Sequence, residues 1–237
     1  MKTNEFIEEL KKINIELTDY QLNQFETYAD FLLEYNKTTN LTAIREKEGV
    51  YLKHFLDSIL IVKDSIVDFK SINSLIDIGS GAGFPGIVIK IVYPHIKLTV
   101  LDSNNKKTKF LEELGKKLNL NDLTVINDRA ENYVKENRHK FDISVARAVS
   151  ELRIISELCL PFTKVDGYFI ALKGHCDEEL KNAESTLKIL NAEVKRKNEF
   201  YLPIENSLRT NLYIKLKKEV DNKYPRPYDQ IIKKALK

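Results

Sequence analysis

Hydrophobic positions in the first third of the chain recur at the spacing of an α-helix. Leu22, Phe25 and Leu32 lie on one helical face, and Thr18 stands three residues before Gln21, the spacing of a helix-capping box. The pattern predicts a helix near Phe6–Ile13, a second that begins after Thr18, a polar break at Asn36–Thr42, and a third helix near Tyr51–Ile66.

From about residue 71 the pattern changes to short apolar runs separated by helical stretches. The predicted strands are Ser74–Ile78, Leu98–Leu101, Leu123–Ile126, Phe141–Val145 and Tyr168–Leu172. Lys106–Leu118 and Glu151–Leu160 are the clearest of the helices between them. Strands that alternate with helices are typical of a mostly parallel sheet.

The last two predicted strands differ, because no helix separates them. Val194–Tyr201 and Asn211–Lys217 are joined by a short loop that contains Pro203, which predicts an antiparallel hairpin at the end of the sheet. We therefore expect a helical N-terminal cap (residues 1–66), an α/β domain (67–218) and a C-terminal tail (219–237).

Composition fits an ordinary globular protein, with 43% hydrophobic and 31% charged residues among 237. No apolar run reaches the roughly 18 residues of a membrane span, and the first residues lack the apolar core of an export signal. Cys159 and Cys176 are the only cysteines, so a disulfide framework or zinc site is not expected. We expect a cytoplasmic protein without a metal, and nothing requires more than a monomer.

Net charge is only +3, but the end of the chain is locally basic. From Lys215 onward there are eight lysines and arginines against three acids. Such a tail is compatible with contacts to phosphates, and a solvated terminus is the alternative.

A glycine-rich turn, Asp77-Ile78-Gly79-Ser80-Gly81-Ala82-Gly83-Phe84-Pro85-Gly86, follows the first predicted strand and opens a helix. Ligands of the nucleotide type bind at this place in open α/β sheets, because glycines let the backbone approach the ligand. Gly81, Gly83 and Gly86 also match the dinucleotide fingerprint, and Asp102 stands where that fingerprint has a ribose-binding acid.

S-adenosylmethionine is favoured over a nicotinamide cofactor by two features. A carboxylate at Asp77 suits a ligand that carries an ammonium group and would repel a pyrophosphate. The terminal hairpin also fits the methyltransferase version of this sheet. A nicotinamide-dependent oxidoreductase and a non-catalytic RNA-binding factor are the alternatives.

The glycine turn and later motifs resemble the bacterial RsmG family, also called glucose-inhibited division protein B. The matching residues are Asn36-Lys37, Asn40-Leu41-Thr42, His54, Asp57-Ser58, Asp77–Gly86, Leu101-Asp102-Ser103, Lys106-Lys107, Phe110-Leu111, Arg129-Ala130-Glu131, Arg147-Ala148 and Lys173-Gly174. They span roughly residues 30 to 175 in the family's order. Val88 departs from the pattern, which usually has proline there, and the tail after Pro225-Arg226 differs too.

The resemblance implies a class I (Rossmann-like) methyltransferase with a seven-stranded sheet that methylates guanine N7 in small-subunit (16S) ribosomal RNA, either free or in the ribosomal subunit. The implied cofactor-binding residues are Gly79, Gly81, Phe84, Asp102 (ribose), Ala130 and Glu131 (adenine), and Arg147. Arg147 is also placed where the cofactor meets the target base, and we assign it a catalytic role together with Asn40.

Guanine N7 already has a lone pair, so an in-line methyl transfer needs no dedicated general base. We expect an unpaired guanine whose phosphates contact Arg129, Arg147 and the Lys106–Lys107 region. Structural alternatives stand beside these roles. In these alternatives Arg147 pairs with a neighbouring acid such as Asp142, and the lysines form a solvated helix face. His54 would be a packing residue, and Asn36 and Asn40 would cap or link helices. We expect Cys159 in the core and Cys176 in a more exposed position.

Overall fold

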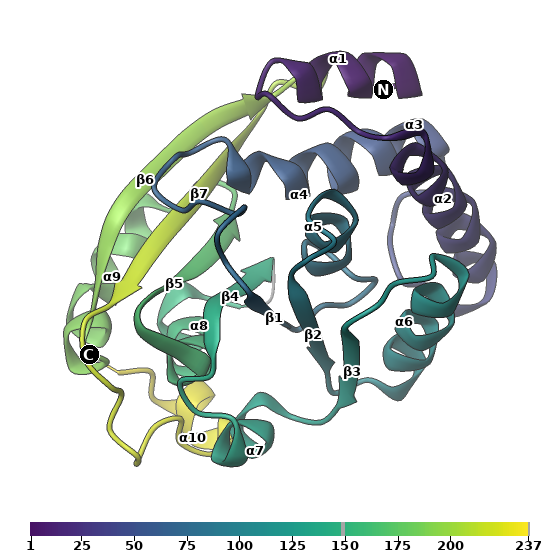
Figure 1. The fold of residues 1–237 in the computed structure, drawn as a ribbon. Helices are drawn as coiled ribbons and strands as arrows, with labels where there is room; N and C mark the ends of the chain where they lie inside the picture. Colours follow the sequence, from purple (N-terminus) through teal and green to yellow (C-terminus); the bar gives the residue numbers. More distant parts are fainter. Residues whose placement is uncertain (148–149, 237) are drawn as a thin grey trace.

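The computed structural model describes residues 1–147 and 150–236. Its strands form one sheet of order β3-β2-β1-β4-β5-β7-β6, in which only β7 runs antiparallel to its neighbours (Figure 1). The strands are β1 (Ser74–Ile78), β2 (Lys97–Asp102), β3 (Leu123–Asn127), β4 (Phe141–Arg147), β5 (Thr163–Lys173), β6 (Ala192–Leu202) and β7 (Ser207–Leu216).

The predicted α/β fold with a terminal hairpin is confirmed, and β1 has the predicted bounds. The other strands are longer than predicted. The largest difference is in β5, which begins at Thr163 rather than Tyr168. Residues 164–166 are exposed and lie in an irregular stretch, because the pairing with β4 passes from Thr163 directly to Tyr168 and the pairing with β7 begins only at Tyr168. This half of the strand therefore lacks the apolar run that marks a buried strand in a sequence.

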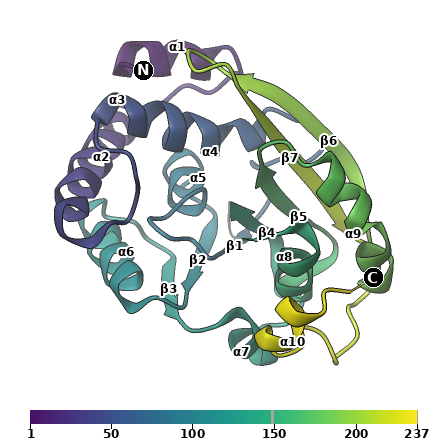
Figure 2. The same ribbon diagram turned by 180° about the vertical axis from the view of Figure 1, so that it is seen from behind.

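Helices cover both faces of the sheet (Figures 1 and 2). Alternate side chains of each strand enter different hydrophobic clusters, as Leu75 and Ile76 of β1 do. The first cluster includes α1 (Thr3–Lys11), α2 (Asp19–Thr39), α5 (Gly86–Val92) and α6 (Asn105–Lys117). The second includes α7 (Ala130–Tyr133), α8 (Leu152–Cys159), α9 (Asp177–Ile189) and α10 (Tyr228–Lys233). Among the described residues, no helix is both long and apolar enough to cross a membrane.

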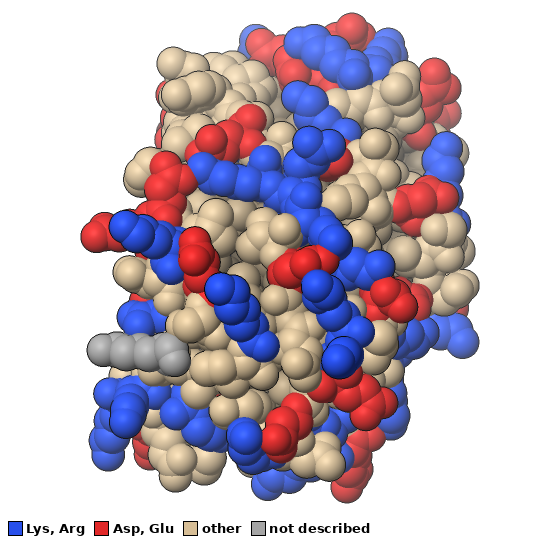
Figure 3. All heavy atoms as spheres, turned by 90° about the vertical axis from the view of Figure 1, so that its left-hand side faces the viewer, with Lys and Arg blue, Asp and Glu red and all other residues tan. Residues whose placement is uncertain are grey.

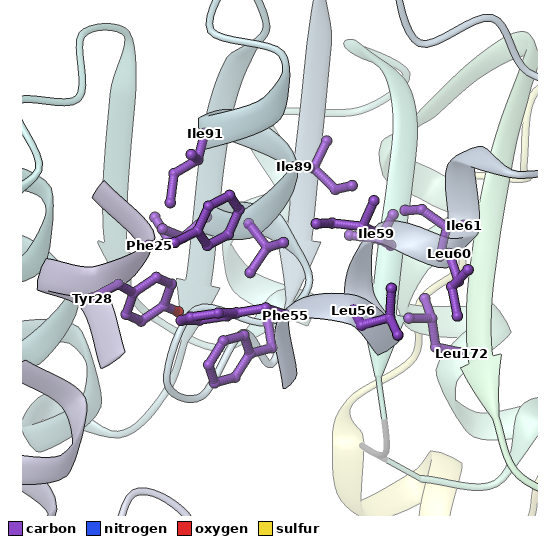
Figure 4. Close-up of a cluster of buried hydrophobic side chains, with 14 of the residues drawn as sticks. Phe25, Tyr28, Phe55, Leu56, Ile59, Leu60, Ile61, Ile89, Ile91 and Leu172 are labelled. Carbon is purple, nitrogen blue, oxygen red and sulfur yellow. The ribbon is translucent and has the colours of Figure 1, made fainter. Parts of the chain in front are cut away.

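The N-terminal helices share a core with the α/β part of the chain. Phe25 and Tyr28 of α2 and Phe55 of the third helical segment pack beside Ile89 and Ile91 of α5 (Figure 4). That third segment runs continuously through α3 (Lys47–Val50), a π-helical stretch (Tyr51–Leu56), α4 (Asp57–Ile59) and a 3₁₀ turn (Leu60–Val62). It begins and ends four residues earlier than the predicted segment.

The predicted helix after Thr18 and its capping box are confirmed, but the polar break is wrong for residues 36–39. The helix continues to Thr39, and Asn40 ends it in the left-handed conformation. It continues because the buried Asn36 amide donates to the carbonyls of Thr42 (2.8 Å) and Ile44 (3.3 Å) and accepts from the Thr42 N–H (3.1 Å). Asn36 therefore links α2 to the loop that follows.

The C-terminal segment folds back onto the second helical layer instead of projecting into solvent. α10 lies beside α7 in both views and contacts α8 (Figures 1 and 2). Ile231 is fully buried there, although Lys233 and Lys234 on the same segment are exposed. Lys237, the last of its basic residues, lies outside the described residues.

Candidate active site

The glycine turn leaves β1 at its carboxyl end and is built on unusual backbone angles. Gly79, Gly81 and Gly83 all have positive φ, at 71°, 61° and 97°. A Cβ atom on Gly83 would lie 2.6 Å from the Tyr28 hydroxyl, which donates to the Ala82 carbonyl. The turn is therefore fixed both by glycine conformation and by a side chain of α2.

Asp77 supports this turn from beneath. Its Oδ2 accepts from the Gly86 N–H (2.8 Å) and from the Ser80 hydroxyl (2.9 Å), and the side chain is fully buried. Burial raises the pKa of Asp77 to about 6, against the opposing effect of those two donors. Asp77 Oδ1 has no hydrogen-bond partner among the described residues, and Asp77 is not part of the wall of the cavity above the turn. An attraction between this carboxylate and a ligand ammonium group therefore stays a prediction.

A cavity of about 580 Å³ opens above the turn at the carboxyl ends of the strands. All of the residues predicted to bind the cofactor line it: Gly79, Gly81, Phe84, Asp102, Ala130, Glu131 and Arg147. Asn40 does not, because its exposed side chain accepts from the Arg45 guanidinium at 3.1 Å. Its neighbours Leu41 and Thr42 line the cavity instead.

Asp102 is the last residue of β2 and lines the cavity. Its Oδ2 accepts from the Gly81 N–H (3.0 Å) and its Oδ1 from the Asn104 N–H (2.9 Å). Lys107 lies 3.5 Å from the same carboxylate, so at least this lysine of the Lys106–Lys107 pair belongs to the cavity wall. Each carboxylate oxygen keeps a lone pair for a further donor.

Past Asp102, the end of β3 and the start of α7 form the next part of the wall. Ala130 and Glu131 line it, and Arg129 pairs with Glu131 at 3.4 Å. The Arg129 guanidinium also lies 5.3 Å from the ring centre of Tyr228, which reaches the cavity from the C-terminal segment.

Arg147 ends β4 and is held by the third helical segment. It donates to the Lys53 carbonyl (3.1 Å), to Asp57 Oδ2 (3.2 Å) and to His54 Nδ1 (3.0 Å). The predicted alternative, a structural pair with a neighbouring acid, is confirmed, but the acid is Asp57 and not Asp142. Asp142 bonds Lys164 and the start of β1. Ala148, which follows Arg147 in the quoted motif, lies outside the described residues.

His54 is both a packing residue and a part of the cavity wall. Because arginine only donates, His54 Nδ1 accepts, and Nε2 carries the proton that it shares with Thr42 Oγ1 at 2.8 Å. The ring stacks on Phe84 with centroids 4.3 Å apart. Burial and the charge of Arg147 lower the pKa of His54 to about 3, so the imidazole is neutral.

A second cavity of about 550 Å³ shares His54 and Arg147 with the first. Asp57 lies in its wall and bonds both Arg147 and Arg209, whose Nε is 3.1 Å from Asp57 Oδ1. Burial raises the pKa of Asp57, and the two guanidinium groups oppose this rise.

Lys173, Glu179 and Asn211 also line the second cavity. Lys173 bonds Glu179 at 2.7 Å and the Ser150 carbonyl. Asn211 is almost fully buried, and its Nδ2 has no hydrogen-bond partner within the described part of the chain. A buried donor without a partner is uncommon in proteins and favours a site that receives an acceptor from a ligand.

Several of these residues carried no signal in the sequence. Arg209 and Asn211 lie on the terminal hairpin, and Tyr228 lies on the C-terminal tail, for which the sequence predicts either contacts to phosphates or a solvated terminus. Cys176 is also 2% exposed, which makes the expectation of an exposed thiol wrong, whereas Cys159 is buried as predicted. Only tertiary contacts bring these residues to their positions.

Comparison with known proteins identifies close relatives along almost the whole chain. The family model described as rRNA small subunit methyltransferase G (GidB) matches residues 21–208. The ribosomal RNA small subunit methyltransferase G of Bacillus pumilus is 46% identical over 229 residues, covering 95% of each chain. The corresponding protein of Bacillus thuringiensis is 45% identical with the same coverage.

Solved structures with the same fold include methyltransferases. The ribosomal protein L11 methylase of Lactobacillus delbrueckii subsp. bulgaricus has a TM-score of 0.52 at 16% identity, over 73% of this chain and 81% of its own. A SAM-dependent methyltransferase from Aquifex aeolicus has a TM-score of 0.51 at 16% identity, over 70% and 93%. At these identities the likeness shows the fold, and it confirms the predicted Rossmann-like methyltransferase architecture.

Proposed function

Since this chain belongs to the rRNA small subunit methyltransferase G family and is an S-adenosylmethionine-dependent methyltransferase, we propose that it methylates N7 of a guanine in small-subunit (16S) ribosomal RNA. The observation that carries the proposal is the pair of cavities that share His54 and Arg147. Methyl transfer requires the donor sulfonium and the acceptor atom to be held close together and in line, which two adjoining cavities allow. The family match speaks against the nicotinamide alternative.

The first cavity fits S-adenosylmethionine by the chemistry of its wall. The Asp102 carboxylate has lone pairs for two ribose hydroxyls, and Gly79 and Gly81, which have no side chain, allow close approach of the ligand to the backbone. The adenine then lies toward Ala130 and Glu131, and the methionine part lies toward Arg147. The cofactor supplies an electrophilic methyl group.

The second cavity is suited to the guanine and its phosphates. Two of the five N–H donors of Arg147 have no partner among the described residues, and guanine O6 beside N7 is a good acceptor for them. Asn211 offers a further donor. The wall of this cavity has four basic residues (Lys53, Arg147, Lys173 and Arg209) and two acids (Asp57 and Glu179), so it keeps a net positive charge although several of these side chains are paired. Arg129 and Lys107 lie at the first cavity, and their contact with RNA phosphates stays a prediction.

The face formed by β6 and α9 is a weaker candidate for phosphate contacts than the second cavity, whose wall has a net positive charge. On the side formed by β6 and α9, lysines and arginines are interspersed with acids (Figure 3). Lys197, for example, pairs with both Asp177 and Glu199. Side chains neutralised in this way attract phosphates less than an unpaired basic groove does.

The chemistry assigned to this site requires orientation more than proton transfer. Guanine N7 attacks through an existing lone pair, so no proton has to leave before the new bond forms. His54 is neutral, and its two ring nitrogens already bond Arg147 and Thr42. We therefore assign His54 to positioning Arg147, and we assign Arg147 to orienting the guanine edge.

The proposal is tested by methyl transfer to ribosomal RNA taken from cells that lack this protein. Labelled S-adenosylmethionine is supplied, small- and large-subunit RNAs are assayed separately as free RNA and as subunits, and the nucleosides are identified. We expect 7-methylguanosine in small-subunit RNA only. Label in another nucleoside, or none in either form of RNA despite measurable cofactor binding, would refute the proposed acceptor.

A further inference from the structure

The C-terminal segment, residues 220–236, is tied to the α/β part of the chain along its length. Arg138 donates to the carbonyls of Val220 (2.7 Å) and Tyr224 (2.6 Å) at the start of the segment. At the other end, the Thr186 hydroxyl donates to the Leu236 carbonyl at 2.7 Å. The segment therefore passes over the second helical layer as a strap fixed at both ends.

A buried ion pair fixes the middle of the strap. Glu157 of α8 is fully buried and accepts from the Arg226 N–H and Nε, both at 2.9 Å, and from its NH2 at 2.6 Å. A buried carboxylate is stable only with such complete pairing. Arg226 stands two residues before Tyr228, so the pair sets where the tyrosine lies.

Tyr228 separates two spaces. Together with Arg129 and Glu131 it lines both the first cavity and a neighbouring cavity of about 420 Å³, whose wall also includes Pro225 and Pro227 of the strap. The Tyr228 hydroxyl has no hydrogen bond to any described residue, so the ring is held by the strap and by the cation–π contact with Arg129. Its aromatic face, rather than its hydroxyl, is the feature offered to a ligand.

We propose that the strap closes the adenine end of the cofactor cavity and that Tyr228 is a cofactor-binding residue whose ring packs against the purine. This rests on the proposed assignment of the first cavity to S-adenosylmethionine. An aromatic ring against a purine contributes affinity through its π face, and Arg129 keeps the ring in place from the protein side.

The test uses the absence of tryptophan from the chain. Tyr228→Trp introduces a single tryptophan whose fluorescence we expect to change on titration with S-adenosylmethionine and with 5′-methylthioadenosine, which both carry the adenine. Tyr201→Trp on the exposed β6 position is the matched control and is expected to show no change.

Calorimetry of two further variants separates the ring from its hydroxyl. We expect Tyr228→Ala to weaken both ligands roughly three- to tenfold by the same factor, and Tyr228→Phe to bind as the wild type does. Thermal melting verifies folding, and Tyr228→Leu, which keeps bulk without a π face, replaces the alanine variant if that one unfolds.

The outcomes distinguish a failure of the Tyr228 proposal from a failure of the cofactor assignment on which it rests. No binding of S-adenosylmethionine by the wild-type chain would refute the cofactor assignment itself. Wild-type binding with an unresponsive tryptophan at position 228, or with unchanged affinity in the alanine or leucine variant, would overturn the role of Tyr228 alone.

Discussion

Arg147, His54 and Phe84 form a stack whose members come from three parts of the sequence. His54 lies on the Phe84 ring, and the Arg147 guanidinium lies 4.9 Å from the centre of the same ring. Asp57 bonds Arg147, and it lines the second cavity but not the first. Changes at Asp57 should therefore affect the acceptor more than the cofactor.

Asp57→Asn tests this separation. Without the carboxylate, Arg147 loses its charged partner and its fixed position, and we expect the methyl-transfer rate to fall about tenfold to a hundredfold. The dissociation constant of S-adenosylmethionine should change much less. Single-turnover assays and calorimetry measure the two quantities. Asp142→Asn, at the opposite end of β4, is the control, and an unchanged rate in Asp57→Asn would contradict the role of Arg147.

His54 should make the protein sensitive to acid. Its pKa of about 3 lies below the value of about 6.5 in an unfolded chain, so the unfolded state binds the proton first as pH falls. Stability is therefore lost from about pH 6.5 downward, by up to about 2 kcal/mol at pH 5.

The measurement is urea unfolding of the wild type and of His54→Gln at pH 7.5 and pH 5. The raised pKa of Asp77 acts in the opposite sense between about pH 4 and 6, so the difference between the two proteins, not the wild-type curve, isolates His54. Equal losses of stability in both proteins would refute a neutral, buried His54.

At the scale of elements, α2 and the glycine turn form one unit. Tyr28 donates to Ala82 at 2.5 Å and its ring is stacked with Phe84, with centroids 5.3 Å apart. Gly83 has no Cβ, so its backbone can lie close to this hydroxyl, and its positive φ is an angle that glycine adopts without strain.

Gly83→Ala should therefore be costly, because the new Cβ meets the Tyr28 hydroxyl and the backbone angle is strained. We expect a loss of about 2 kcal/mol or more in the free energy of unfolding, together with weaker cofactor binding. Gly174→Ala is the control, since its Cβ would have no neighbour closer than the Leu208 carbonyl oxygen at 4.0 Å. Chemical denaturation compares them, and equal stability of both variants would contradict the close approach.

Local sequence patterns predicted most of the helices and strands, but they did not predict the contacts between distant residues that complete the site. β1, the glycine turn and the capping box follow from periodicity and turn chemistry, which are encoded within a few residues. The continuation of α2 through Asn36 depends on a bond to Thr42, and the burial of Cys176 depends on packing in the second cluster. Such outcomes are set by residues distant along the chain, as is the Arg147–Asp57 pair.

At the scale of the whole molecule, the strap joins the end of the chain to the cofactor cavity. Arg226→Met leaves Glu157 buried without its partner, and we expect a loss of about 3 kcal/mol in stability. The strap should also open. Limited trypsin digestion at Lys233 and Lys234 should become faster, and S-adenosylmethionine affinity should fall by a factor similar to that of Tyr228→Ala.

Lys223→Met is the control for this prediction, since the contacts of Lys223 with Asp221 and the Tyr224 ring both lie within the same segment. If Arg226→Met is digested at the wild-type rate and binds the cofactor normally, the ion pair does not hold the strap closed.

His54 and Arg147 face both cavities, and this shared wall has a thermodynamic consequence. An occupant that moves either side chain changes the surface presented to the other occupant, so the two binding equilibria are coupled. Linkage requires the coupling to be reciprocal. If bound cofactor tightens RNA by some factor, RNA tightens cofactor by the same factor, and loss of the methyl group on reaction alters both affinities together. The order in which products leave is then governed by the same two side chains that orient the reactants.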